Sequence, residues 1–186
     1  MFAEDLNLAS RAQGGDSLAL DELVQRHTEQ LFRVVRRMMS DRQEAEEIVQ
    51  EAWVRAWRGL PQFKADRPFF PWLARIAVNA VRDSWRKRRP LDFADASGEL
   101  EHLADQVEGP EPALERREML AQLAQAVAKL RPEQRMVLSL RYEAGFSYQE
   151  IAATMDLPLN TVRTHLRRAK LALRQRLEVR DERLAG

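Results

Sequence analysis

The side chains best suited to binding a partner are basic, and they gather in two short stretches. One stretch closes the first half of the chain, with Arg82, Arg86, Lys87, Arg88 and Arg89. The other occupies residues 163–176 without any acidic residue, with Arg163, Arg167, Arg168, Lys170, Arg174 and Arg176. Positive charge at this density favours a polyanion such as nucleic acid. A solvated helix face is the alternative, and charge alone does not separate the two.

A pattern typical of a helix-turn-helix positions the second stretch. Ser147 and Glu150 form an S-x-x-E capping box, which predicts a helix start at Ser147. The run Asp156-Leu157-Pro158 ends this helix, and Asn160 or Thr161 is expected to cap the next one. The second helix then has an apolar stripe and, one residue further on, a basic stripe at the same spacing: Val162, Leu166, Ala169 and Leu173 beside Arg163, Arg167, Lys170 and Arg174. Such a unit places the N-terminal residues of its second helix in the major groove of DNA.

Individual roles in this helix follow from side-chain chemistry. Arg163 has the fork geometry for a bidentate contact to guanine, and Thr164 or His165 can reach a base or a phosphate. Phosphate contacts, which position the helix without reading sequence, are assigned to Arg167, Arg168 and Lys170.

The first basic stretch ends a helix expected over residues 69–89. One face of this helix is apolar, and the other carries Trp72, Arg75, Asn79, Arg82 and Arg86. Rings that stack and guanidiniums that pair with phosphate suit contact with unstacked bases. The alternative is that Trp72 and Trp85 belong to the core.

A third helix, expected to open at Asp41 and to extend to Leu60, has a mixed outer face. That face presents Glu46, Glu47, Gln50, Glu51, Val54 and Trp57. A solvated face seldom needs a valine and an indole beside its carboxylates, so this face indicates a protein partner.

The elements that position these residues are all helical, because the apolar spacing is helical nearly throughout. Further helices are expected over 4–13, 18–39, 113–130 and 132–145, with a loop at 61–68. His27 lies on the apolar stripe of its helix and is interpreted as a core histidine. The predicted fold class is all-α, with two small helical domains, of which the C-terminal one contains the helix-turn-helix.

Charge divides the 186 residues into three segments. Residues 1–90 carry a net +3, residues 91–118 a net −7 and residues 119–186 a net +5. We therefore predict domains at 1–90 and 113–186, joined by a flexible acidic linker at 91–112. The absence of cysteine excludes disulfides and thiolate metal sites, the three histidines are scattered, and neither a cofactor nor a metal is predicted. No apolar run spans a bilayer and no signal peptide is recognised, so an intracellular protein is expected.

Together these motifs resemble a known family. LRPEQRMVLSLRY (130–142), GFSYQEIA (145–152) and PLNTVRTHLRRA (158–169) are similar to the C-terminal domain of bacterial sigma factors. DRQEAEEIVQEAWVRAW (41–57) resembles the helix with which sigma factors grip RNA polymerase, and PFFPWLARIAVN (68–79) resembles their promoter-melting helix. The two-domain plan matches the extracytoplasmic-function group.

The resemblance implies a role for each matching position. The clamp helices of the largest polymerase subunit would be bound by Glu47, Gln50, Glu51 and Val54. The non-template strand of the −10 element, with one base flipped out, would be held by Phe63, Lys64, Ala65, Asp66, Arg67, Trp72, Arg75, Asn79, Arg82 and Arg86. The −35 element would be contacted by Asn160, Thr161, Arg163, Thr164, His165, Arg167 and Arg168. Asn160 and His165 depart from residues common in the family, so the −35 sequence that is read is expected to differ.

The resemblance also implies partners and a location. Promoter DNA, the clamp helices and flap region of core RNA polymerase and an anti-sigma factor are expected partners, without membrane insertion. The protein is expected in the cytoplasm, associated with the nucleoid. The acidic linker would pass through the polymerase near the RNA path.

Three other classes compete with this interpretation. A stand-alone helix-turn-helix regulator leaves residues 18–89 without a role and normally dimerises. A helical adaptor that binds only proteins leaves the acid-free face at 163–176 unexplained. An enzyme is the least supported class, because no phosphate loop, metal cluster or Ser/His/acid group is recognisable.

Overall fold

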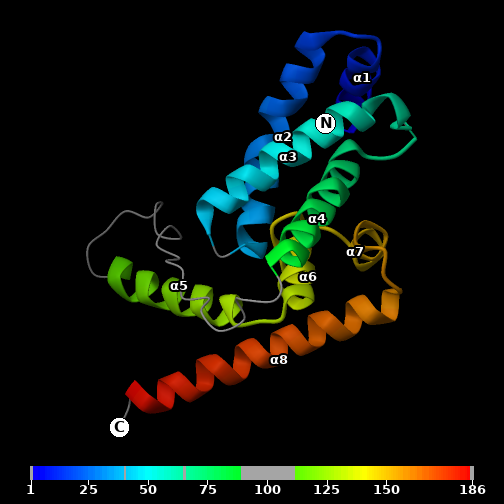
Figure 1. Cartoon of the computed structure of the whole chain (residues 1–186). Coiled ribbons are helices and arrows are strands. Elements are labelled where there is room, and N and C mark those ends of the chain that lie inside the picture. Colours follow the sequence, from blue (N-terminus) through cyan, green and yellow to red (C-terminus); the bar gives the residue numbers. More distant parts are fainter. Residues whose placement is uncertain (1, 40, 65, 89–111, 185–186) are drawn as a thin grey trace.

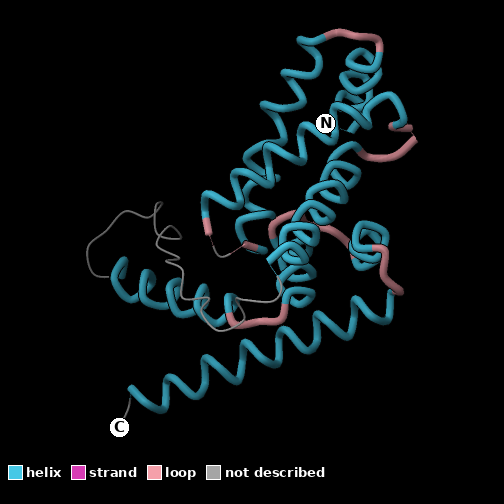
Figure 2. Tube along the Cα trace, viewed as in Figure 1, coloured by secondary structure: helices cyan, strands magenta, loops and turns pink. Residues whose placement is uncertain are grey.

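The computed structural model describes residues 2–39, 41–64, 66–88 and 112–184. This part of the chain contains helices and no strand, which confirms the all-α fold class (Figure 2). The helices are α1 (Phe2–Gln13), α2 (Ser17–Met38), α3 (Arg42–Gly59), α4 (Phe69–Arg88), α5 (Pro112–Ala128), α6 (Pro132–Tyr142), α7 (Tyr148–Met155) and α8 (Leu159–Leu184), with a 3-10 turn η1 (Leu60–Gln62) after α3 (Figure 1). Residues 91–111 of the predicted linker lie outside the described residues.

Two of the predicted helix starts are confirmed by their capping bonds. The Asp41 carboxylate accepts the backbone N–H of Glu44 at 2.9 Å and opens α3. At α7 the Ser147 hydroxyl accepts the Glu150 N–H at 3.2 Å, while the Glu150 carboxylate accepts the Ser147 N–H at 2.7 Å. These reciprocal bonds satisfy backbone donors that a helix start leaves without partners.

Two other boundaries differ from the sequence prediction. Asn160 and Thr161 lie inside the first turn of α8 and do not cap it, because Pro158 supplies the carbonyl that accepts the Thr161 N–H at 2.9 Å. The fixed φ of proline favours this position just before a helix. The helix α6 ends at Tyr142 and does not continue to Gly145, whose φ of +73° returns the chain so that Phe146 N–H reaches the Leu140 carbonyl at 3.0 Å.

His27 is a core residue, as the sequence predicted. Its ring is buried between Phe69 and Phe70, and its Nε2 lies 3.1 Å from the Asp5 carboxylate of α1. Burial lowers the pKa of His27 below its ordinary value because the apolar surroundings disfavour the imidazolium, although Asp5 acts in the opposite direction. A neutral imidazole therefore joins α1, α2 and the start of α4.

The two predicted domains pack against each other and contribute to one hydrophobic cluster. The helix α6 contacts α2, and α7 contacts α4. At the centre of the first contact the buried Ser139 hydroxyl donates a hydrogen bond of 2.6 Å to the Val34 carbonyl. Beside it, Arg37 Nε donates to the Glu143 carboxylate at 2.8 Å.

The second contact, between α4 and the helix-turn-helix, combines an arginine with aromatic packing. Arg82 Nη2 donates to the Met155 carbonyl at the end of α7, at 2.9 Å. The Phe70 and Phe146 rings meet edge to face with their centroids 6.0 Å apart. Because apolar burial and satisfied polar groups both contribute here, the interface resembles a continuation of the core more than a wet contact between surfaces.

Replacing Ser139 with alanine is expected to lower the free energy of unfolding by about 1 kcal/mol, because the Val34 carbonyl loses a buried donor. All four tryptophans precede residue 90, so tryptophan fluorescence during urea unfolding reports on the half without the mutation. A lower urea midpoint in Ser139→Ala is the expected result, because the two halves share a core. Thr164→Ala, which removes an exposed hydroxyl from the same half, is the control. A tryptophan transition that Ser139→Ala leaves in place would show that the halves unfold independently.

Candidate polymerase and nucleic-acid interfaces

The outer face of α3 is exposed, as a partner surface requires. Glu47, Gln50 and Glu51 are exposed, and successive spacings of three, one and three residues place them on one side of the helix with Val54. Val54 is 46% exposed, and Trp57, one turn further on, is 62% exposed. An indole and a valine held in water beside carboxylates form an amphipathic surface that a protein can cover.

One arginine ties this face to the neighbouring helix. Arg55 donates to the Glu51 carboxylate at 2.6 Å and to Asp83 of α4 at 3.0 Å. The guanidiniums of Arg55 and Arg86 hold the pKa of Asp83 below its ordinary value by donating hydrogen bonds to the carboxylate. The relative position of α3 and α4 is therefore fixed at the surface as well as in the core.

The structure brings the predicted −10 residues of α4 into one stripe. Trp72, Arg75, Asn79, Arg82 and Arg86 repeat at intervals of three and four residues along the helix. Arg75, Asn79 and Arg86 are exposed, whereas Arg82 is half-buried by its bond to Met155. Among these predicted nucleic-acid contacts, Arg82 donates a hydrogen bond to the second half of the chain.

The loop before α4 is anchored by aromatic rings. Phe63 is 5% exposed and packs against Trp72 and Phe69 at centroid distances of 4.9 and 5.6 Å. Its ring is a core group in this arrangement and supports the loop, and the contact of Phe63 with the −10 strand stays a prediction. Trp72 stays half-buried. Lys64, Asp66 and Arg67 are exposed, Arg67 donates to Asp66 at 3.2 Å, and Ala65 lies outside the described residues.

Gln13, which was not among the predicted site residues, also holds this loop. The Gln13 amide donates to the carbonyls of Leu60 and Phe63 at 2.8 and 2.7 Å. It fixes the backbone on both sides of the turn after α3. Nothing in the sequence around Gln13 signals this contact, since its partners lie about fifty positions away.

The recognition helix α8 presents its first turns to solvent. Arg163, Thr164, Arg167 and Arg168 are exposed, and His165 is half-buried. On the opposite side Val162, Leu166 and Ala169 are buried, which anchors the helix in the core. The predicted apolar and basic stripes are both confirmed.

Asn160 organises the first turn of α8. Its side-chain carbonyl accepts a hydrogen bond of 3.3 Å from Arg163 Nη1. Its backbone carbonyl accepts the Thr164 hydroxyl at 2.8 Å. The arginine with the geometry to read guanine is therefore oriented by a neighbour before any DNA is present. Thr161, also in this turn, is half-buried.

Among the described residues, no three His, Asp or Glu side chains are grouped so that they could hold a metal ion. No described helix is both long enough and apolar enough to cross a membrane. The exposed faces of α3, α4 and α8 thus remain the candidate sites.

The chain is similar to known proteins along most of its length. Residues 23–90 match the family model described as Sigma-70 region 2, and residues 120–173 match Sigma-70, region 4. The RNA polymerase sigma-H factor of Pseudomonas aeruginosa is 35% identical over 94% of both chains. The ECF RNA polymerase sigma-E factor of Escherichia coli K12 is 32% identical, again over 94% of both chains.

Solved structures give the same relationship. The structure of CnrH in complex with the cytosolic domain of CnrY superimposes with a TM-score of 0.71 at 30% identity, over 95% of this chain and 98% of CnrH. CnrH of Cupriavidus metallidurans is a sigma factor that is 34% identical over 96% of both chains. The fold is also that of RpoE from Bartonella quintana, solved with the anti-sigma factor NepR, with a TM-score of 0.70 at 23% identity over 86% of this chain and 96% of RpoE. The chain therefore belongs to the extracytoplasmic-function group of the sigma-70 family and is a sigma factor of bacterial RNA polymerase.

Proposed function

We propose that this sigma factor uses three exposed helix faces. The face of α3 would bind polymerase, the face of α4 would hold the −10 element and the face of α8 would read the −35 element. The observation that carries the proposal is that one chain presents an acidic face with an exposed valine and indole on α3 and an acid-free basic face on α8. A protein partner fits the first face, and a polyanion fits the second. A stand-alone DNA-binding regulator has no use for the first.

The first half of the chain, residues 1–90, would bind polymerase and open DNA. Glu47, Gln50, Glu51 and Val54 of α3 would contact the clamp helices of the largest subunit. Trp72, which is half-buried, and the stripe that follows it on α4 would hold the −10 strand after one base leaves the stack. Unstacking costs a few kcal/mol, which aromatic and guanidinium contacts must offset.

The second half, residues 113–186, would read the −35 element through α8. Arg163 would contact a guanine edge, and Arg167 and Arg168 would contact phosphates. The exposure of all three side chains supports these roles. The flap region of the polymerase would bind the same half. Between the halves, the acidic linker at 91–112 would follow the RNA path.

This division requires the two halves to separate on the promoter. The −10 and −35 elements lie about 25 base pairs apart, which is about 85 Å of duplex at the rise of each strand. The helix α4, which carries the −10 stripe, is about 30 Å long, and it contacts α7, the helix just before the recognition helix. While α4 and α7 remain in contact, the two faces lie too close together to bind both promoter elements at once. Promoter binding must therefore break the contacts of α6 and α7 with α2 and α4.

Regulation and location complete the proposal. An anti-sigma factor would bind this chain as NepR binds RpoE of Bartonella quintana. The chain would act in the cytoplasm, on the nucleoid, and would catalyse no reaction itself, since RNA synthesis belongs to the polymerase.

Transcription in vitro tests the proposal directly. Core bacterial RNA polymerase is combined with this protein and a library of promoter fragments. Promoter-dependent transcripts that vanish without the protein are expected. A DNA shift by the protein alone, without any transcript, would favour the stand-alone regulator. A lack of both would favour the adaptor.

Replacing Glu47, Gln50 and Glu51 together with alanine is expected to weaken binding to core polymerase at least tenfold, because the exposed face loses its charged and amide contacts. The urea midpoint should stay near that of the parent, since all three side chains are exposed. Affinity is measured by fluorescence anisotropy of the labelled sigma factor. Alanine at exposed Glu29 on α2 is the control for loss of an acidic group. Unchanged affinity in the triple variant would remove the assignment of the α3 face.

Replacing Arg163 with alanine is expected to change which −35 sequences are used, because a bidentate arginine contact discriminates by about 1–3 kcal/mol. Transcription from a library randomised at the −35 element measures this preference. A relaxed requirement at one guanine is the expected outcome. A uniform loss over all −35 sequences would instead identify Arg163 as a phosphate contact.

A further inference from the structure

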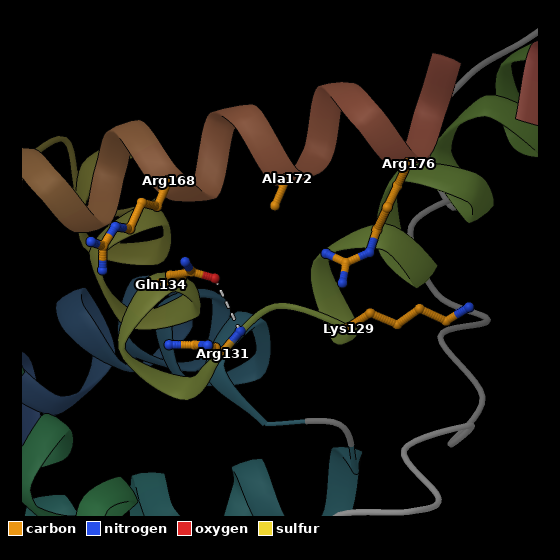
Figure 3. A pocket seen from close by; sticks show the side chains of 6 residues that line it. All are labelled: Lys129, Arg131, Gln134, Arg168, Ala172 and Arg176. Atoms are coloured by element: carbon orange, nitrogen blue, oxygen red, sulfur yellow. Dashed lines mark hydrogen bonds between the residues drawn. The ribbon is translucent and has the colours of Figure 1, made fainter. Parts of the chain in front are cut away.

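A groove that the sequence analysis did not anticipate lies beside the recognition helix. It has a volume of about 480 Å³ and is lined by Lys129, Arg131, Gln134, Arg168, Ala172 and Arg176 (Figure 3). One wall is α8, and the other is the turn from α5 into α6. Four of the six lining residues are cations, and none is acidic.

The cations of this groove have no acidic partner among the described residues. Lys129, Arg131, Arg168 and Arg176 are all exposed, and no carboxylate of the described part of the chain forms an ion pair with them. Like charges that face one another across a groove raise each other's energy, and an anion between them removes that cost. The positive charge of the groove therefore favours a ligand with several negative groups.

The polar remainder of the groove is fixed in place. Gln134 is buried, and its side-chain carbonyl accepts the Arg131 backbone N–H at 3.2 Å, the dashed bond in Figure 3. This bond holds the turn that carries Arg131 and the end of α5. Ala172, between the two arginines of α8, keeps the floor of the groove open because its side chain is small.

The groove continues the face of α8 that is proposed to bind DNA. Arg168 belongs to both surfaces, and Arg176 lies two turns further along the helix, about 12 Å away at the helical rise. One DNA strand carries a phosphate about every 3.4 Å along the duplex axis, so this distance matches about three phosphates. A strand that passes the N-terminal turns of α8 can therefore extend into the groove.

The lining favours a phosphate backbone over a protein segment. Ala172 is the one apolar residue in the lining, whereas the centre of a protein interface is usually apolar and poor in charge. No side chain of the groove is positioned by another to read a base as Asn160 positions Arg163. Contacts of this kind strengthen binding without selecting sequence.

We propose that Lys129, Arg131 and Arg176 form a second phosphate-binding surface, which holds the backbone of the same duplex that α8 reads. The proposal rests on the proposed function, since it needs the −35 duplex on α8. Arg168 joins the two surfaces. The backbone strand would lie between α8 and the turn before α6.

The test uses holoenzyme, with core polymerase and the full chain, on a promoter duplex. The variant Lys129→Gln/Arg131→Gln/Arg176→Gln removes three charges, and Arg33→Gln on α2 is the exposed charge control. Each lost phosphate contact reduces the slope of log affinity against log salt by about 0.9. A slope shallower by about 2–3 is expected for the triple variant, with an unchanged affinity ratio between the −35 sequence and a scrambled one. Arg33→Gln should keep the parental slope.

Ethylation of single phosphates locates the contact. Ethylating phosphates beside the −35 element should weaken the binding of the parental holoenzyme to the duplex. At two or three of these phosphates, ethylation should leave the binding of the triple variant unchanged. The proposal would be overturned if the triple variant kept the parental salt slope, or if its affinity ratio between the −35 sequence and a scrambled one changed. Weaker polymerase binding without DNA would assign the groove to a protein contact and overturn it as well. If the parental protein shows no −35 preference, the proposed function fails instead, so the two failures are distinguishable.

Discussion

The packing of α6 and α7 against α2 and α4 is the constraint on which the rest of the structure depends. Small domains bury only a modest share of their surface, so each half gains from packing against the other. The Ser139 hydrogen bond to Val34 and the Phe70–Phe146 contact extend each core into the other half. The stability of either half therefore includes a contribution from its neighbour, while the faces of α3 and α8 stay exposed.

If the halves separate on a promoter, as proposed, the separation has a cost that binding must offset. Each large apolar side chain that becomes exposed costs about 1.5–3 kcal/mol. The Arg82 guanidinium and the Met155 carbonyl lose their mutual hydrogen bond but regain hydrogen bonds to water. If the open form is a minor population, the apparent affinity for promoter falls by that fraction. A partner that stabilises the open form would raise promoter affinity, and one that stabilises the closed form would lower it.

What the sequence could predict depends on the distance between interacting residues. The caps at Asp41 and Ser147 and the stripes of α8 arise within a few positions, so these two helix starts and the exposed arginines of α8 followed from spacing. The Ser139 bond to Val34 and the Arg37–Glu143 pair join residues more than a hundred positions apart, and no local pattern marks them. The burial of Phe63 could not be read from the resemblance, which transfers a position without its surroundings. The basic groove was missed because its cations come from two segments that lie far apart in the sequence, the turn from α5 into α6 and the helix α8.

The first turn of α8 shows how a departure from the family pattern can alter recognition. Asn160 accepts from Arg163 through its side chain and from Thr164 through its backbone. An arginine that is already oriented loses less side-chain entropy on binding, but it must exchange its asparagine contact for a base. The Thr164 hydroxyl donates within the helix, so in this arrangement it can accept a hydrogen bond from a base but has no proton left to donate. If Arg163 reads a guanine as proposed, Asn160 would be the residue that positions it.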